Sequence, residues 1–590
     1  MVESLLARFE MQHIQSGKSK VVSGADAVRL VKPGSSIHLA TTHSVPFGLT
    51  FELTRSFWDK KPGFELVTLG ASVNVQVMLR NPGFLRRIIT SYAGNVYPAP
   101  SPALIFQEIY REGTVPIENW SLLTLVLRLM AGAMHLPFIP TNSLAGSGME
   151  TENRGSSVAR VKDPFGDADQ TVIRSLVPDY TLLHGWAADS SGNVLALAPW
   201  TEFNYGALAA KTGVIASVER IVESGYVRDH SDDLLVPGSQ VLAVVHMPYG
   251  AHPSPCRGYP PHWGYAEDGP FLTEFRAASK NLDSLDEWAR KWVLGVSRQQ
   301  YIKQLGQNHL RTLRDQATPD SWRRQTEQRM QTVDFEAPVR PIEQMVVAMA
   351  QVCCDRVRAR SYRSILAGQG TSNLAAWLAY YKLAEEGIDV DLMAEIGLFG
   401  YAPRPPQPLI FNSANFATCK GASSAVDVLG IHASGARGKE CIGLLGAALV
   451  DQYGNVDSTC IPDGRSWLLG SGGSNDVLSG SAEVIVCCPQ DARRLWPEVP
   501  YITGPGRAVT TLVTTKAIFR KTTPDGSFLL EAVIPSVTES NRPVETLVQE
   551  IRESTGWEIG TSSSMAVLSP PDSNLVRLLR IFDPDCYYLK

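Results

Sequence analysis

A six-residue pattern, D-x-x-G-N-V, occurs twice in the chain and constrains its architecture more than any other feature. It spans residues 189–194 and 451–456, and each copy follows an apolar run of strand length. Asn and Gly tolerate positive φ and the Asp side chain bonds nearby amides, so each copy predicts a strand followed by a tight turn. The repeat predicts that the 590 residues contain two related halves.

The order of predicted elements around the two copies supports the same division. Residues 24–57 and 343–387 each read as a helix, a short strand and a turn that enters another helix, and strand-like runs follow at 64–71 and 390–400. Alternating strands and helices are typical of βαβ units with parallel strands. We therefore expect an α/β fold with two homologous open domains and mainly parallel sheets.

The boundary between the two halves is predicted near residue 335. The segment 268–335 is polar and contains helix-like stretches such as LDEWARKWVLGV. We expect a first domain of residues 1–335, with this segment as a helical C-terminal extension, and a second domain of residues 336–590.

Composition excludes several classes of function. The net charge of −5 provides no broad positive field for nucleic acid or for an anionic membrane. The most apolar stretch, residues 121–140, is interrupted by Arg128 and His135 and ends at prolines, which predicts a buried helix and no membrane span. The first twenty residues lack the pattern of a signal peptide, and the nine cysteines form no C-x-x-C pair. We expect a cytoplasmic protein with reduced thiols and no metal site.

Glu395 stands out among the charged residues, since it lies in an apolar strand-like run directly before a glycine-rich turn. Glutamate is rare in buried strands because an unpaired buried carboxylate is costly. The residue is therefore a candidate nucleophile or base, and the alternative is an ordinary strand-end glutamate in water.

Two glycine-rich segments are candidate ligand sites. In 469–476, LGSGGSND, Gly472 and Gly473 would let the backbone approach a ligand and direct amides at negative charge, and Ser474 and Asn475 add side-chain donors. The segment matches neither a P-loop nor a dinucleotide fingerprint. In 368–370, GQG, the glycines open a helix and suit an anion or a carbonyl. For both segments the alternative is a loop without a ligand.

Glu118 is a weaker candidate, in the segment 117–121, IENWS, at the start of the long apolar helix. A carboxylate in that position complements the positive end of the helix dipole, which is the default interpretation. A catalytic role for Glu118 is the minority alternative.

Together these motifs resemble the family I coenzyme A transferases, in particular the glutaconate CoA-transferase type, whose A and B subunits are open α/β domains with the active site between them. Residues 1 to about 335 resemble the A part, through IENWS at 117–121, the stretch 127–148, ADSSGNV at 188–194 and GAHPSPCRGY at 250–259. Residues from about 340 to 590 resemble the B part, through GQG at 368–370, EIGLFGYAPRP at 395–405, GLLGAALVDQYGNVDST at 443–459, GSGGSND at 470–476 and TGWEIG at 555–560.

The resemblance implies a role for each candidate residue. Glu395-Ile396-Gly397 matches the E-x-G context of the family's nucleophile, and the GSGG loop lies in its acyl-CoA site, so Gly472 and Gly473 amides would hold the thioester oxyanion. Residues that would contact coenzyme A are Gly368, Gln369, Gly370, Gly397, Ser474 and Asn475. Glu118 is a possible counterpart of the glutamate that acts in ring-cleaving relatives.

One stretch departs from the family. A Gly-Gly-Phe type turn is often found near the start of the A part, whereas the matching residues here, 41–47, read TTHSVPF without a glycine pair. The contribution of this half to the oxyanion hole and to the acyl pocket is therefore open.

The implied activity is transfer of coenzyme A from an acyl-CoA donor to a carboxylic acid through a covalent glutamyl-CoA thioester. Coenzyme A would be substrate and product, with no tightly bound cofactor, no metal and no nucleic-acid or membrane partner, and we expect a homodimer of the fused chain. Two alternatives remain: an acyl-CoA hydrolase, ring-cleaving lyase or decarboxylase on the same fold, and a non-catalytic acyl-CoA-binding protein.

Overall fold

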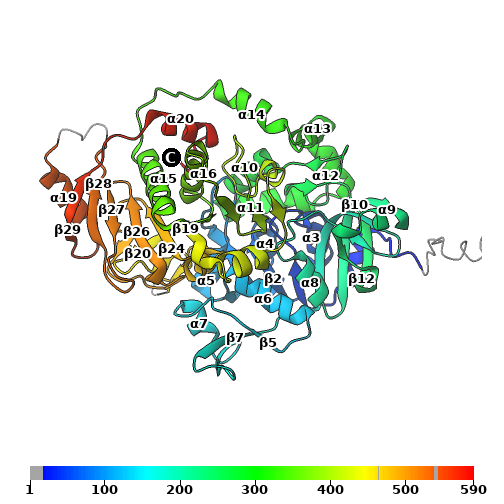
Figure 1. Cartoon of the computed structure of the whole chain (residues 1–590). Coiled ribbons are helices and arrows are strands. Elements are labelled where there is room, and N and C mark those ends of the chain that lie inside the picture. The colour runs from blue at the N-terminus through cyan, green and yellow to red at the C-terminus, as the bar shows by residue number, and fades with distance from the viewer. Residues whose placement is uncertain (1–17, 463, 537–541) are drawn as a thin grey trace, which may run out of the picture.

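The computed structural model describes residues 18–462, 464–536 and 542–590. Two large, mainly parallel sheets dominate it, one built from residues 36–246 and the other from residues 364–567 (Figure 1). The α/β fold with mainly parallel sheets is confirmed. The boundary between residues 335 and 336 stays a prediction.

The first sheet has nine strands. Its path runs β11-β9-β8-β1-β2-β3-β4, and β10 pairs with β8 on one side and β12 on the other. Only the β8–β9 and β9–β11 pairs are antiparallel. The strands are β1 (Ser36–Leu39), β2 (Phe64–Ala71), β3 (Leu85–Ala93), β4 (Ile117–Asn119), β8 (Tyr180–Asp189), β9 (Val194–Leu195), β10 (Gly213–Val222), β11 (Leu234–Val236) and β12 (Val241–His246).

Helices cover this sheet because its strands are apolar on both faces. All ten residues of β8 are buried, as expected for a parallel strand that is covered on both sides. The helices of this half that matter for the site are α3 (Phe47–Phe57), α4 (Val73–Leu79), α6 (Leu122–Ala133) and α8 (Phe203–Ala209). Helix α6 begins the apolar stretch 121–140, and its residues Leu122 to Leu129 are buried, which confirms the predicted core helix.

The second sheet has ten strands in the order β18-β17-β16-β15-β19-β24-β26-β27-β28-β29. They are β15 (Ser364–Ala367), β16 (Asp391–Ala394), β17 (Leu398–Phe399), β18 (Gly421–Ala422), β19 (Cys441–Gly446), β24 (Glu483–Cys488), β26 (Val509–Thr514), β27 (Ala517–Arg520), β28 (Leu529–Val533) and β29 (Gly560–Val567). The helices that pack on it are α15 (Pro341–Arg360), α16 (Thr371–Glu385), α18 (Ser474–Gly480) and α19 (Val544–Glu553), and α20 (Ser573–Phe582) packs on α15 and α16.

The two sheets share a common strand order. Five parallel strands run β12-β10-β8-β1-β2 in the first sheet and β26-β24-β19-β15-β16 in the second. The central strands of these two sets are β8 and β19. The first D-x-x-G-N-V turn begins at the end of β8, and the second begins at the end of β20 (Leu449–Asp451), the short strand that comes next after β19 in the chain. The predicted pair of related halves therefore appears as one repeated topology.

Each repeated turn is closed by its aspartate. The carboxylate of Asp189 accepts the Asn193 amide at 3.0 Å, and that of Asp451 accepts the Asn455 amide at 2.9 Å. Each asparagine side chain then accepts a glycine amide at 2.8 Å, from Gly238 in the first half and from Gly506 in the second. These bonds explain why a six-residue pattern persists in both halves.

In the sequence, the strands of the two sheets are separated by a group of helices over residues 269–330. The sequence predicts a helical extension in this segment. The helices are α10 (Gly269–Ala278), α11 (Leu282–Ala289), α12 (Arg298–Leu305), α13 (Gln307–Gln316) and α14 (Ser321–Met330). Figure 1 shows them above the first sheet, next to α16.

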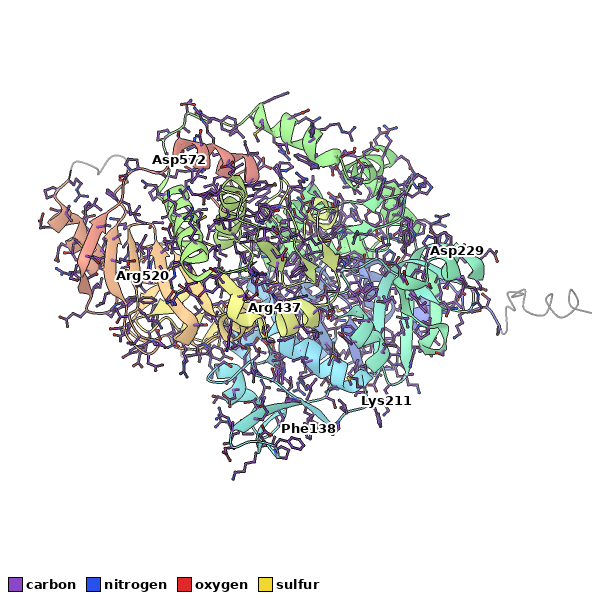
Figure 2. The ribbon with its side chains drawn as sticks, in the orientation of Figure 1. Phe138, Lys211, Asp229, Arg437, Arg520 and Asp572 are labelled. Carbon is purple, nitrogen blue, oxygen red and sulfur yellow. The ribbon has the colours of Figure 1, made fainter. Side chains whose placement is uncertain are left out.

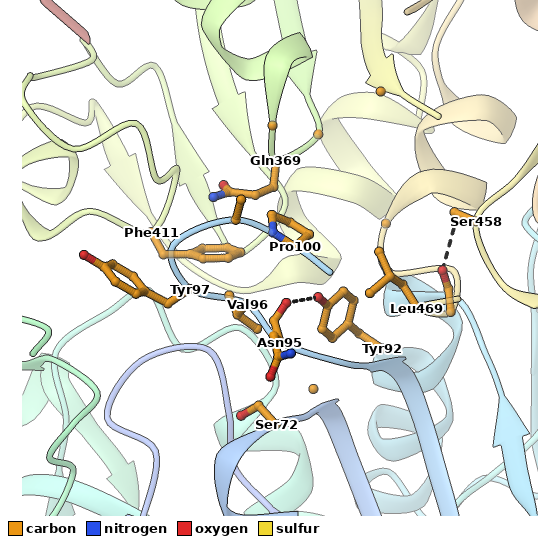
Figure 3. Close-up of a pocket in the computed structure, with 18 of the residues that line it drawn as sticks. Ser72, Tyr92, Asn95, Val96, Tyr97, Pro100, Gln369, Phe411, Ser458 and Leu469 are labelled. Atoms are coloured by element: carbon orange, nitrogen blue, oxygen red, sulfur yellow. Dashed lines mark hydrogen bonds between the residues drawn. The ribbon is translucent and has the colours of Figure 1, made fainter. Parts of the chain in front are cut away.

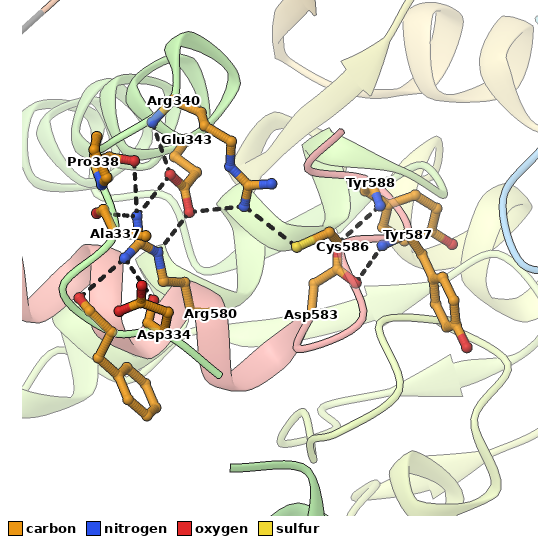
Figure 4. Close-up of polar contacts among 11 residues, drawn as sticks. Asp334, Ala337, Pro338, Arg340, Glu343, Arg580, Asp583, Cys586, Tyr587 and Tyr588 are labelled. Atoms are coloured by element: carbon orange, nitrogen blue, oxygen red, sulfur yellow. Dashed lines mark hydrogen bonds and ion pairs between the residues drawn. The ribbon is translucent and has the colours of Figure 1, made fainter. Parts of the chain in front are cut away.

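The last helix is fixed to the second half by a buried ion pair. Arg580 on α20 donates to both carboxylate oxygens of Glu343 on α15, at 2.8 and 3.0 Å (Figure 4). Burial raises the pKa of Glu343, but the bonds from Arg580 and Arg340 outweigh it and lower that pKa to about 2. Beyond α20, Asp583 accepts the amides of Tyr587 and Tyr588 at 2.7 and 2.8 Å, which places these tyrosines against the central cavity.

A three-stranded antiparallel sheet projects from the first half. It consists of β5 (Phe138–Pro140), β7 (Asp169–Arg174) and β6 (Val158–Lys162), and Phe138 lies on its outer side (Figure 2). Across the described residues, the structure contains no helix with the length and apolarity that a membrane crossing requires.

Candidate active site

A cavity of about 620 Å³ lies between the two halves, and residues of both line it. Figure 3 shows Ser72, Tyr92 and Tyr97 of the first half and Gln369 and Phe411 of the second around it. Residues within three positions of the ends of four parallel strands line it: Thr41 and Thr42 after β1, Ser72 after β2, Gly368 after β15 and Glu395 after β16. Ligands bind at the carboxyl ends of parallel strands, so this position suits a substrate site.

Glu395 lies in this cavity at the end of β16, where the next residues turn sharply. The turn is closed by the Gly397 amide, which donates to the Ala394 carbonyl at 3.1 Å, and Gly397 has φ +114°. Burial, and after it the nearby Asp476 carboxylate, raise the pKa of Glu395 to about 7. A carboxyl group that is close to half ionised near neutral pH is suited to nucleophilic or acid–base chemistry.

Gly473 lies directly beneath the Glu395 carboxylate. A Cβ atom built on Gly473 would fall on Oε2 of Glu395, so any side chain there would displace the carboxylate. Gly473 is also the N-cap of α18, and its N–H donates to no other described residue. The turn therefore offers one backbone donor without a partner among the described residues, next to a carboxylate.

Gly472 does not offer a second donor. It also lines the cavity, but its N–H donates to the carbonyl of Ser91, at the end of β3, at 2.8 Å. The expectation that Gly472 supplies an oxyanion amide is corrected by this bond, because a backbone N–H has one proton to donate. Its carbonyl is engaged as well, since it accepts the Leu122 amide of α6 at 2.8 Å.

Asp476, on the first turn of α18, ties the site to the other half. Its carboxylate accepts the Ser121 hydroxyl at 2.6 Å and the Leu123 amide at 2.9 Å, so it caps the N-terminus of α6 from across the interface. Burial raises the pKa of Asp476 to about 7, although these two bonds act in the opposite direction.

The GQG loop forms another wall of the same cavity, and Gly368, Gln369 and Gly370 all line it. The Gln369 side chain donates to the Tyr588 hydroxyl and accepts the Ile410 amide at 3.0 Å, so both ends of this amide have protein partners. Gly370 has φ +123°, and no atom lies within 4 Å of the position of a Cβ. The loop therefore presents backbone and open space.

The other predicted coenzyme A contacts divide into two groups. Ser474 lines the cavity, whereas Gly397 and Asn475 do not. Asn475 is buried, accepts the Leu144 amide and donates to the Thr503 carbonyl, both at 3.0 Å. Its side chain joins three segments of the fold and is not available to a ligand.

Glu118 is also outside the cavity. Its carboxylate pairs with Arg87 and with Arg128, the latter at 2.9 Å, and it accepts the Trp120 indole N–H at 2.7 Å. With three donors, the Glu118 carboxylate holds the segment that leads into α6, which is a structural role.

Several cavity residues carry polar groups that the sequence did not single out. Glu267 lines the cavity, and burial together with the adjacent Asp268 raises its pKa to about 8. Thr201 and Glu202, directly before α8, lie behind the wall: the Thr201 hydroxyl donates to the Ile396 carbonyl at 2.9 Å, and Glu202 accepts the Thr41 amide at 2.8 Å. The one sequence signal for this part of the first half was the missing glycine pair at residues 41–47, which left its contribution to the acyl pocket open.

Two buried clusters have the composition of metal ligands: His252, Asp268 and His309, and His184, Glu219 and Cys256. In the first, both histidines bond the Asp268 carboxylate; in the second, His184 bonds Glu219 at 2.8 Å. Ordinary hydrogen bonds account for these contacts, so neither cluster needs an ion.

Comparison with known proteins agrees with this geometry. Residues 21–247 match the family model described as coenzyme A transferase. The A subunit of glutaconate CoA-transferase from Acidaminococcus fermentans is 28% identical over 315 residues, which cover 50% of this chain and 95% of that protein. The A subunit of 3-oxoadipate CoA-transferase from Pseudomonas knackmussii is 27% identical over 272 residues, or 45% and 91% of the two chains.

A solved structure extends the likeness to the whole chain. The acyl-CoA transferase YdiF of Escherichia coli O157:H7 has the same fold, with a TM-score of 0.62 over 95% of this chain and 96% of that one, at 15% identity. The first half of the chain is thus similar to the A subunits of coenzyme A transferases, and residues 21–247 match that family's model, while the whole chain shares the fold of YdiF.

Proposed function

We propose that this enzyme moves coenzyme A from an acyl-CoA donor to a carboxylic acid, with Glu395 as the covalent nucleophile. The observation that carries the proposal is the position of the Glu395 carboxylate, in a cavity between the two halves and directly above Gly473, whose N–H donates to no other described residue. A nucleophile and a free backbone donor on two neighbouring turns are elements that acyl transfer requires.

In the first stage the Glu395 carboxylate attacks the thioester carbonyl. The oxygen of that carbonyl gains negative charge, which the Gly473 N–H stabilises; one well-placed donor is worth about 3–4 kcal/mol. The carbon–sulfur bond breaks, the coenzyme A thiolate leaves, and an acyl-glutamyl anhydride remains. The thiolate then attacks the Glu395 carbonyl of the anhydride and releases the donor acid, which leaves a glutamyl-CoA thioester.

The second stage repeats these steps in reverse order with the acceptor acid. Its carboxylate attacks the glutamyl-CoA carbonyl and displaces the thiolate, and the thiolate attacks the acyl carbonyl of the new anhydride. The product acyl-CoA leaves and Glu395 is again a carboxylate. Coenzyme A is substrate and product throughout, and these steps use no resident cofactor.

Mass spectrometry of the protein after incubation with an acyl-CoA tests the proposal. We expect a coenzyme A adduct on the peptide that contains Glu395, and hydroxylamine should convert it to a hydroxamate. The adduct should be absent from Glu395→Gln and present in Glu118→Gln, provided that both variants fold. Turnover by the wild-type chain without modification of Glu395 would contradict the mechanism.

Release of free coenzyme A separates transfer from hydrolysis. We expect consumption of acyl-CoA to depend on an added carboxylic acid, because the anhydride is protected from water in the cavity. Release of coenzyme A at the same rate without an acceptor would indicate a hydrolase. Assembly into a homodimer is a further proposal that sedimentation of the purified chain measures.

A further inference from the structure

The turn after β1 has a backbone conformation that ordinarily belongs to glycine. Thr42 has φ +90° and Ser44 has φ +49°. Thr42 is the third residue after β1, and Gly370 is the third residue after the corresponding strand β15, with φ +123°. A β-branched residue in this region is strained, whereas glycine is not.

The surroundings impose this conformation on Thr42. On one side, Glu202 accepts both the amide and the hydroxyl of Thr41, at 2.8 and 3.1 Å. On the other side, the Ser44 amide donates to the Pro255 carbonyl at 2.8 Å, and the ring of His43 stacks on Phe203. Strain that is fixed from both sides is found where a site needs a particular geometry.

The side chain of Thr42 faces the substrate cavity. Thr42 is half-buried and lines the cavity, while Thr41, His43 and Ser44 are buried. Neither the amide nor the hydroxyl of Thr42 bonds another described residue. Glycine would fit this backbone without strain, so the retained side chain indicates a contact that glycine could not make.

The same turn is coupled to the nucleophile through two adjacent residues. Glu202 holds Thr41, and Thr201 donates its hydroxyl to the carbonyl of Ile396, next to Glu395, at 2.9 Å. A ligand group in contact with Thr42 therefore lies on the part of the wall that is linked to the reacting carboxylate. If Glu395 attacks the thioester as proposed, the part of an acyl-CoA next to this wall is its acyl group.

We propose that the Thr42 hydroxyl bonds the acyl group of the substrate and makes the enzyme prefer acyl chains that carry a polar oxygen, such as a hydroxyl or oxo group, over plain alkanoyl chains. This inference rests on the proposed function, since it assigns a specificity-determining residue to the same site. A hydroxyl can donate to an oxo group or accept from a hydroxyl, so it suits both.

A pair of donors that differ by one hydroxyl tests the assignment. The ratio of kcat/KM for 3-hydroxybutyryl-CoA to that for butyryl-CoA, with acetate as acceptor, should exceed one in the wild-type enzyme. In Thr42→Val, which keeps the shape and loses the hydroxyl, the ratio should fall by about 3- to 10-fold, the usual effect of one neutral hydrogen bond. Thr42→Gly should show the same fall and unfold at no lower temperature than the wild type, because its backbone is unstrained.

Ser44→Gly is the matched control, since Ser44 lies in the same turn, also has positive φ and does not line the cavity. It should leave the ratio unchanged. An unchanged ratio in Thr42→Val, or an equal fall in Ser44→Gly, would overturn the inference. The Glu395 adduct formed from butyryl-CoA distinguishes the two failures: its absence from the wild type contradicts the proposed function, whereas an adduct with an unaltered ratio contradicts only the role of Thr42.

Discussion

The two halves place the same three turns at or behind the wall of one cavity and build them from different residues. After the first strand, the chain has Thr41-Thr42 in one half and Gln369-Gly370 in the other; after the second, Ser72 and Glu395; before the helix that follows the repeated turn, Thr201-Glu202 and Gly472-Gly473. Thr201 and Gly472 have the same φ, +51°.

The difference between Gly473 and its counterpart Glu202 indicates how the two halves differ in function. In the second half, glycine at 473 leaves room for the carboxylate of Glu395 from the neighbouring turn. In the first half, the equivalent Glu202 fills that room and bonds Thr41. The second half therefore suits chemistry, and the first half suits support and recognition of the substrate.

The largest effect is expected when the second turn is exchanged between halves. Glu395→Ser, which copies Ser72, should lower the rate of coenzyme A exchange by about 10⁴-fold or more, because the nucleophile is lost. Adding Ser72→Glu to that variant should not restore exchange, since the first half lacks the glycine turn beneath it. Recovery of exchange in the double variant would show that the two halves are chemically equivalent.

The next effect concerns the third turn. Gly473→Ala should lower kcat by about 10²–10³-fold, because the new methyl group displaces the Glu395 carboxylate and the N–H beside it from the geometry that transfer needs. Gly472→Ala is the control: no atom lies within 4 Å of its Cβ position, and its φ of +51° predicts a stability loss of about 1 kcal/mol with the exchange rate retained. Equal loss of kcat in both variants would show that the rate depends on the backbone of the whole loop and not on the space between Gly473 and the Glu395 carboxylate.

A smaller effect is expected from pH. Since the pKa of Glu395 is about 7 and the nucleophile is the carboxylate, kcat/KM should rise roughly tenfold from pH 5 to 6 and level off above pH 7. Asp476→Asn removes a neighbouring negative charge, so the midpoint of this profile should move to lower pH. The first half has uncharged Tyr205 at the corresponding position of α8, and Tyr205→Phe should leave the midpoint unchanged.

The smallest effect concerns stability and the counterpart of Gly473. Burial raises the pKa of Glu202 from 4.5 to about 8, so the folded chain binds a proton that the unfolded chain releases between these values. Glu202 therefore makes the protein less stable as the pH rises from about 5 to 8. In Glu202→Gln the free energy of unfolding should fall less over this interval, by about 4 kcal/mol at most, as measured by urea unfolding at several pH values. An unchanged slope would mean that Glu202 is ionised in the folded chain.

Sequence reasoning reached the features that depend on local chemistry. The side chains of Asp189 and Asp451 bond the residue four positions later in the chain, so the repeated turn could be predicted from the local sequence pattern. Glu395 could be identified because a glutamate in an apolar strand is costly to bury, which indicates a functional role. The alternating elements predicted two parallel sheets, and both are present.

The contacts that the sequence did not predict involve partners remote in the chain. Nothing near Gly472 indicates that Ser91 would take its amide, and the partners of Asn475 are Leu144 and Thr503. Glu118 is held by Arg87, thirty-one positions before it, because β3 and β4 are neighbours in the sheet. Such partners follow from packing, which a pattern of residue types does not contain.

The Gly472 amide donates to Ser91 of the first half, the Leu122 amide donates to Gly472, and the start of α6 donates to Asp476. These bonds across the interface have a consequence for the order of events during folding. A chain in which both sheets had formed but had not yet docked would possess Glu395 and its glycine loop without the contacts that fix the loop. The glycine loop beside Glu395 would then take its final position only when the two halves dock. We therefore expect the carboxylate to become reactive toward thioesters only in the fully folded chain. The interface thereby acts as a checkpoint on assembly as well as a wall of the cavity.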